Sequence, residues 1–237
     1  MLNRNLGDMK NKIEAFIKKS TLIGDKVNIT GGKGHLILRE YTTKSKVIRI
    51  PDYITDIEFS SAFRNCANLE ELVLPPIKEL AIHSIVVPND SISKIVIHKE
   101  TKRINKLFKR KSLEIELLGN VEIREGAISD IGDLKIINSN LIQKVGYYGI
   151  DHVGIDELSI NKSVLTPNSM VRCIINQLDI QHAQSNYSFR ECDIDNVNYY
   201  IEELKIKELT DKETLKDYMN NKLFWMCNIG NINIIQI

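Results

Sequence analysis

The sequence is poor in the residues and segments that mark several common classes of protein. Its 237 residues include four cysteines, five prolines and 6% aromatic residues, and no two cysteines form a C-x-x-C pair. Apolar runs are only a few residues long, and the first residues lack the apolar stretch and cleavage site of a secretory signal. The sequence therefore predicts a cytoplasmic protein without membrane contact. Its 43% hydrophobic and 27% charged residues are ordinary for a soluble globular chain.

Residue patterns that carry chemistry are also missing. The five histidines have no paired metal spacing, and Asp151-His152 has no nucleophile signature near it. Gly31-Gly32-Lys33-Gly34 does not match a phosphate-binding loop, and its place between two alternating apolar segments predicts a hairpin turn. We therefore expect no catalytic residue, no metal and no cofactor, and we expect that the protein is not an enzyme.

Positive and negative charges nearly cancel, but they are unevenly distributed. The chain has 32 basic and 31 acidic residues, and the net charge is +9 over residues 1–112 and −8 over residues 113–237. The balanced total gives no global attraction to nucleic acid or to an anionic membrane. The asymmetry leaves two interpretations open. Either the charges only solvate the surface, or an elongated body with a basic and an acidic end orients a charged partner.

Short alternating apolar segments repeat along the chain. Each has two apolar residues with one residue between them, and successive segments start 19 to 24 residues apart, at 48, 72, 95, 115, 134, 158 and 178. Each segment predicts a strand with one buried face, and this period is typical of a solenoid with one strand per coil. The expected fold class is an α/β repeat solenoid with right-handed coils. A parallel β-sheet would form one face, with short helical or irregular turns behind it.

One stretch of the repeat carries a more specific motif. Residues 50–57 read IPDYITDI and residues 62–69 read AFRNCANL, with weaker copies at 113–136 and 185–199. These segments resemble the BspA-type leucine-rich repeat, whose units contain I-P-x-x-(V/I)-T-x-I and A-F-x-x-C-x-x-L. The resemblance implies a leucine-rich-repeat solenoid, and it implies a binding or adhesion role.

The four cysteines share one place in the repeat. A large apolar residue lies three positions before each of Cys66, Cys173, Cys192 and Cys227. This shared position predicts a buried, stacked column of small apolar side chains rather than a disulfide or a reactive site.

The two ends of the chain differ from the repeats between them. Residues 1–25 are expected to form an N-terminal capping helix, and residues 26–237 the solenoid. Met9, Ile13, Phe16 and Ile17 have helical spacing with lysines opposite, which favours a cap over a membrane or partner helix. Thr210-Asp211-Lys212-Glu213 has the spacing of a capping box, so a helical insertion is expected near 210–226 in the last repeat.

Two surfaces are candidates for partner binding. The basic segment 99–111 is expected to be a helical turn with Ile104, Leu107 and Phe108 inward, and its cations could be solvated or could contact an acidic protein or nucleic acid. The second surface is the outward strip of the sheet, which continues through Lys135, Ser159 and Asp179, together with two outward tyrosines. The candidate residues are Lys102, Arg103, Lys106, Lys109, Arg110 and Lys111 in the basic segment, and Arg49, Val73, Val96, Glu114, Glu116, Tyr148 and Tyr200 elsewhere.

The leading functional hypothesis is a non-catalytic protein–protein interaction module. It would act inside a cell as an accessory or inhibitory binding protein, for example one encoded by a phage or a mobile element. Its partner would be another protein, and the oligomeric state is left open. The alternatives are a nucleic-acid-binding protein that uses residues 99–111, and a cell-surface adhesin that lacks its export signal.

Overall fold

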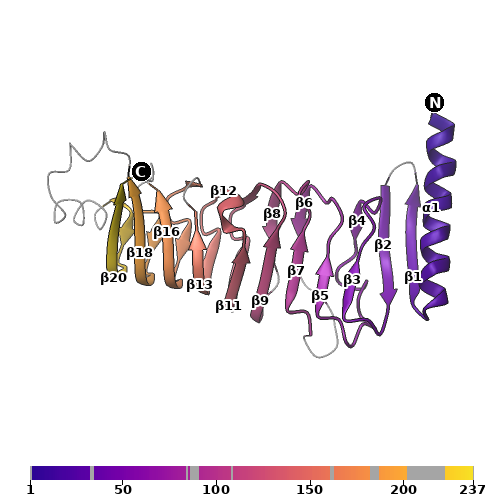
Figure 1. The fold of residues 1–237 in the computed structure, drawn as a ribbon, viewed down its shortest axis with the longest axis horizontal. Coiled ribbons are helices and arrows are strands. Elements are labelled where there is room, and N and C mark those ends of the chain that lie inside the picture. Colours follow the sequence, from indigo (N-terminus) through magenta and orange to yellow (C-terminus); the bar gives the residue numbers. More distant parts are fainter. Residues whose placement is uncertain are drawn as a thin grey trace.

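The computed structural model shows an elongated β-solenoid of parallel strands with about seven turns. It describes residues 2–32, 35–83, 85, 91–107, 109–160, 163–181, 187–201 and 222–236. Helix α1 lies at one end of the solenoid and strand β20 at the other (Figure 1). The solenoid of parallel strands expected from the repeat spacing is therefore confirmed.

The N-terminal end is covered by a helix and a hairpin. Helix α1 (Leu2–Leu22) contacts β1, and its residues Met9, Ile13 and Phe16 pack against the core. Strands β1 (Lys26–Gly32) and β2 (His35–Thr42) pair antiparallel, and β4 (Asp56–Ile57) adds to β2 in parallel. The predicted helix and the predicted hairpin are both present.

The following coils form a twelve-stranded parallel sheet. Its inward residues are stacked in register, so that Ile48, Leu72, Ile95 and Ile115 follow one another across four strands. The strands before residue 120 are β3 (Val47–Arg49), β5 (Glu71–Val73), β7 (Lys94–Ile97) and β9 (Arg110–Leu117). The later ones are β11 (Ile128–Ile137), β13 (Ile150–Ser159), β15 (Met170–Val171), β16 (Ile174–Gln181), β17 (Phe189–Arg190), β18 (Asp193–Ile201), β19 (Phe224–Trp225) and β20 (Asn228–Gln236).

A second parallel sheet, of five strands, forms the other side of the coils. Its strands are β6 (Glu79–Ala81), β8 (Arg103–Lys106), β10 (Val121–Ile123), β12 (Ile142–Val145) and β14 (Val164–Leu165), and the 3-10 turn η2 (Ser139–Leu141) precedes β12. The expectation of helical or irregular turns is wrong for these segments. Inward and outward residues alternate along them, as in Val121-Glu122-Ile123, and that alternation suits a strand.

The basic segment 99–111 is also a strand segment rather than a helical turn. It contains β8 and the first residues of β9, which belong to different sheets. Ile104 and Leu107 are buried, as predicted, whereas Phe108 lies outside the described residues. The backbone hydrogen bonds of β8 go to the neighbouring coils, as in its pairing with β10, so they cannot also close a helical turn.

Buried apolar residues from both sheets form one continuous core. Cys66, Cys173 and Cys192 are buried, Cys227 is half-buried, and all four thiols are free. The predicted burial is therefore confirmed for three of the four. A single column of four is wrong: Cys173, Cys192 and Cys227 lie on consecutive coils, whereas Cys66 lies in an earlier coil and donates to the carbonyl oxygen of Tyr41 at 2.9 Å.

In the coils from β11 onward, the chain turns one corner in the same way each time. In each of these coils, one residue at the corner has a left-handed backbone, and the residue that follows it points into the core. The left-handed residues are Asp130, His152, Arg172, Glu191 and Met226. The chain bends directly after this position. There a Cβ on Gly154 would lie 2.3 Å from the carbonyl oxygen of Gly132, so only glycine allows the two coils to approach so closely.

The last repeat ends in a full strand. β20 pairs in parallel with β18 over its whole length. Of the helical insertion expected near 210–226, residues 210–221 lie outside the described residues, while Phe224 and Trp225 form strand β19 rather than helix. Within the described part of the chain, no helix is both long and apolar enough to cross a bilayer.

Candidate functional site

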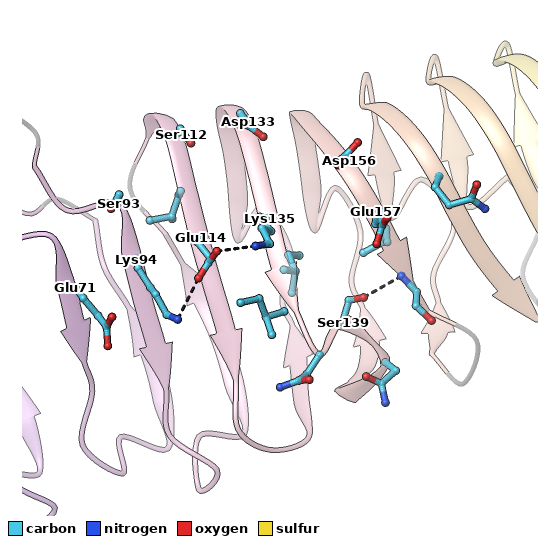
Figure 2. Close-up of a pocket in the computed structure, with 18 of the residues that line it drawn as sticks. Glu71, Ser93, Lys94, Ser112, Glu114, Asp133, Lys135, Ser139, Asp156 and Glu157 are labelled. Carbon is cyan, nitrogen blue, oxygen red and sulfur yellow. Dashed lines mark hydrogen bonds and ion pairs between the residues drawn. The ribbon is translucent and has the colours of Figure 1, made fainter.

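The outward face of the twelve-stranded sheet carries an open groove of about 910 Å³ (Figure 2). The groove extends from β3 to β16, and most of its lining residues are outward residues that alternate with the core residues of each strand, as Lys94 alternates with Ile95. Hydroxyl and amide groups line much of it. These belong to Ser93, Ser112, Asn138, Ser139, Asn140, Ser159 and Gln177.

Acidic side chains outnumber basic ones in the groove. Lys94 and Lys135 are its two basic residues, and the acidic residues that line it are Glu70, Glu71, Glu114, Asp133, Asp156, Glu157 and Asp179. The carboxylates labelled in Figure 2 are spread from β5 to β13, and they belong to Glu71, Glu114, Asp133, Asp156 and Glu157. The groove therefore carries a net negative charge along most of its length.

The two lysines of the groove are already bound to carboxylates. The Nζ atom of Lys94 lies 2.7 Å from Glu116 and 3.1 Å from Glu114, and Lys135 lies 3.0 Å from Glu114. Hydrogen bonds to Glu116 and Glu114 raise the pKa of Lys94, and the hydrogen bond from Lys135 is the main cause that lowers the pKa of Glu114. These ion pairs connect β7, β9 and β11, and they occupy both of the lysines that line the groove.

Of the remaining carboxylates of the groove, Glu70 is paired with Lys46 at 2.7 Å, and the others have amide partners or no charged partner among the described residues. Asp156 accepts a hydrogen bond from Asn176 at 2.8 Å, and Asp179 accepts one from Asn198 at 2.8 Å. Among the described residues, no ion pair reaches Asp133 or Glu157. A cation that enters the groove would therefore meet carboxylates whose charge is not yet neutralised.

The structure brings together only part of the predicted outward strip. The groove is lined by Glu114, Lys135, Ser159 and Asp179 of that strip. Glu116 is not in the lining, but it forms an ion pair with the lining residue Lys94. Arg49 is exposed at the end of β3.

Val73 and Val96 are not the exposed contact residues that the sequence predicted. Their exposed fractions are only 8% and 7%. The two valines are adjacent in one outward row that continues into Arg49 on one side and Glu116 on the other. Each is therefore enclosed by the outward side chains of the strands beside it.

The basic segment does not line the groove, and several of its cations have partners. Arg103 lies 2.6 Å from Glu79, Lys106 donates to the carbonyl oxygen of Gly126 at 2.8 Å, and Lys109 lies 2.6 Å from Asp130. Lys102 and Lys111 are exposed, and Arg110 begins β9. Most of the basic segment thus lies away from the groove, although Arg110 and Lys111 belong to β9, the strand that also carries Glu114.

The two predicted tyrosines are also far from equivalent. Tyr200 is a half-buried outward residue of β18, in register with Gln181 and Ile235. Tyr148 lies in the turn before β13, where its ring is 4.5 Å from that of Tyr147 and its hydroxyl accepts a hydrogen bond from Arg190 at 3.3 Å.

Sequence reasoning missed the other aromatic residues at this corner. Tyr187 and Trp225 lie close together, with ring centroids 6.2 Å apart, and the guanidinium of Arg190 lies 4.5 Å from the Trp225 ring. A usable signal was present for Tyr187, because Tyr148-Gly149-Ile150 and Tyr187-Ser188-Phe189 have the same order of aromatic, small and large apolar residues.

Within the described ranges, no three His, Cys, Asp or Glu side chains are placed to hold a metal ion. No protein-family model, curated protein or solved structure matches the chain.

Proposed function

We propose that the protein is a non-catalytic binding module that holds a cationic segment of a partner protein in the groove. The observation that carries this proposal is the open groove with an excess of carboxylates along the twelve-stranded sheet. Its length across many coils suits an extended segment of chain better than a small compact ligand. Lysine and arginine side chains of such a segment would pair with Asp133, Asp156 and Glu157.

Electrostatics supports a cationic partner over an anionic one. Lys94 and Lys135 are held by Glu114 and Glu116, so an anion entering the groove would have to break those pairs. Complementary charge also speeds encounter and excludes wrong partners, which is the main contribution of charged residues at an interface.

We also propose that the coils are right-handed leucine-rich repeats of the BspA type. Support comes from the A-F-x-x-C unit, whose phenylalanine and cysteine are buried both at Phe63 and Cys66 and in the similar S-F-x-x-C unit at Phe189 and Cys192. A crystal structure with left-handed coils would contradict this assignment.

The binding proposal is tested by affinity capture with a matched pair of variants. D133K/E157K reverses two charges in the groove, and E100K/E125K makes the same change in total charge at exposed residues outside it. We expect one protein from the lysate of the source cell to bind the wild type and E100K/E125K, and to bind D133K/E157K at least tenfold more weakly. Equal capture by all three proteins would contradict the proposal, as would capture of nucleic acid alone.

A further inference from the structure

A strip of exposed aromatic residues follows the corner where β13, β15, β17 and β19 begin. We define the aromatic strip as Tyr147, Tyr148, Tyr187, Arg190 and Trp225. The exposed fractions of Tyr147, Tyr187 and Trp225 are 46%, 44% and 41%. Arg190 connects the two ends, because it donates to the hydroxyl of Tyr148 and its guanidinium lies over the ring of Trp225. Tyrosine, tryptophan and arginine are the residues that most often dominate binding energy at interfaces.

The backbone at two of these tyrosines is one that glycine or asparagine would adopt more readily. One corner position recurs in successive coils with a left-handed backbone, and it is occupied by Gly126, Tyr148, Asn168 and Tyr187, with φ of 59°, 50°, 50° and 54°. Glycine and asparagine suit this conformation, whereas a bulky side chain is strained in it. Tyr148 and Tyr187 therefore keep an unfavourable backbone while their rings are half-buried or exposed. Such strain is concentrated at functional sites.

The charges of the strip are paired within the protein. Arg190 lies 2.8 Å from Glu191, and Arg172 on the intervening coil makes a two-oxygen contact with Asp151, the shorter distance being 2.7 Å. Positive and negative groups thus alternate around the aromatic rings. This balance is complementary to an uncharged ligand, because a polyanion or a polycation would find an opposite and a like charge side by side.

A small hollow opens beside the strip. It has a volume of about 320 Å³ and is lined by Pro167, Asn168, Tyr187 and Trp225. The rings of Tyr187 and Trp225 are inclined at 59° to each other, so they form two walls of an open wedge. The lining is mostly apolar, with a single amide, and the buried Oδ1 atom of Asn168 has no hydrogen-bond partner.

We propose that the aromatic strip is a binding site for a proline-rich, extended segment of a partner protein, separate from the groove. Such a segment adopts a polyproline II helix, whose proline rings pack on aromatic side chains and whose carbonyl groups have no internal partner. The Trp225 indole N–H and the tyrosine hydroxyls are donors for those carbonyls. Because the helix is already ordered before binding, a shallow surface can hold it at a small entropic cost.

The dimensions of the strip set the length of the bound segment. Tyr147 and Trp225 are separated by three steps between adjacent coils, along β13, β15, β17 and β19. At about 4.8 Å per step the strip is roughly 14 Å long. A polyproline II helix rises about 3.1 Å per residue, so about five residues would lie along it.

The single tryptophan of the sequence, Trp225, makes the test direct. Its fluorescence is followed while the full chain is titrated with an uncharged, capped decaproline peptide, with a capped Gly-Ser peptide of equal length, and with a chitin or cellulose hexasaccharide. We expect a saturable change with decaproline and none with the other two. Saturation by a hexasaccharide instead, or no change with decaproline at millimolar concentration, would overturn the proposal.

Variants separate binding from folding. Y148N and Y187N replace each strained tyrosine with asparagine, the residue that occupies the equivalent corner position at Asn168. Y200N makes the same change at an outward tyrosine outside the strip. We expect Y148N and Y187N to bind decaproline at least tenfold more weakly while their urea midpoints stay equal to or above that of the wild type, and Y200N to bind normally. Normal binding by Y148N and Y187N, or a lowered urea midpoint in both, would contradict a binding role for these tyrosines.

Discussion

The coils before and after β11 join their outward polar residues by different chemistry. Before β11 the links are ionic, as between Lys46 and Glu70 at 2.7 Å and between Lys94 and Glu116 at 2.7 Å. Among β16, β18 and β20 they are amide ladders, in which Asn233 donates to Asn198 at 3.0 Å and Asn198 donates to Asp179, whereas the ion pair of Arg172 with Asp151 joins β13 to the next coil. Both arrangements satisfy polar groups between stacked coils. Only the ionic one is weakened by salt.

The same two halves also fold one sequence unit in two ways. Ala62-Phe63-Arg64-Asn65-Cys66 forms a hydrogen-bonded turn, in which Cys66 N–H donates to the carbonyl oxygen of Phe63. Ser188-Phe189-Arg190-Glu191-Cys192 contains strand β17 and the left-handed residue Glu191. In both, the aromatic residue and the cysteine are buried. The repeat therefore specifies which residues face the core, and the local backbone adapts to that requirement.

The largest expected effect tests whether the two units have equal roles in the core. Phe63 and Phe189 are both fully buried. We expect F63A and F189A each to lower the free energy of unfolding by about 4 kcal/mol, measured by urea denaturation, because each leaves a cavity. A loss below about 1 kcal/mol for either one would show that its unit is not a core element.

A smaller effect tests the difference in backbone between the two halves. M226G replaces an exposed residue with φ of 55°. R64G replaces an exposed residue of the hydrogen-bonded turn at residues 62–66, whose φ is not in the left-handed region. We expect M226G to raise the free energy of unfolding by about 1 kcal/mol and R64G to lower it by about as much. Changes of the same sign in both variants would contradict the described difference.

Salt provides a still smaller test of the ionic and amide links. Hydrogen exchange measured by mass spectrometry gives the opening free energy of each strand. When NaCl is raised from about 0.05 M to about 1 M, we expect the opening free energy of β5, β7 and β9 to fall by roughly 0.5 kcal/mol. We expect no comparable fall in β16, β18 and β20. A uniform response along the solenoid would contradict the distinction.

The thiols of Cys66 and Cys192, one from each half, are expected to stay protonated and unreactive at neutral pH. Burial raises the pKa of Cys66 to about 11, and a hydrogen bond with Cys173 is the main cause that raises the pKa of Cys192 to about 12. Because the folded pKa values exceed the ordinary value of 9.0, the protonated thiols of Cys66 and Cys192 contribute their full share of stability below pH 9. That stability is lost as the pH rises toward 11 and 12, because the thiols of the unfolded chain ionise before those of the folded chain. Rapid reaction of native Cys66 or Cys192 with Ellman's reagent at pH 8 would contradict their protection.

The strands of the long sheet could be predicted because alternation marks their inward residues, as in Leu72-Val73-Leu74 and Leu178-Asp179-Ile180. The second sheet could not, because inward residues such as Ile104 and Leu107 lie three positions apart, a spacing that also suits a helical turn. The groove was predicted only through its outward residues, such as Glu114. Its acidic excess depends on which lysines are bound within the protein, and that is a property of the register between coils.

The part of Trp225 in the aromatic strip was hidden for another reason. Arg190 and Trp225 each lie two residues before a cysteine of the repeat, but the spacing of 35 residues between Cys192 and Cys227, instead of about 20, does not show that their coils are adjacent. Only the pairing of β17 with β19 brings them together.

The central claim, that the groove is the partner-binding surface, is tested most directly by photocrosslinking in the lysate of the source cell. A photoreactive amino acid replaces exposed Ser112 in the groove in one protein, and exposed Lys102 beside the five-stranded sheet in another. We predict a covalent adduct from position 112 that maps to a Lys- or Arg-rich segment of one protein, and none from position 102. An adduct from position 102 alone, or one with nucleic acid, would contradict the account.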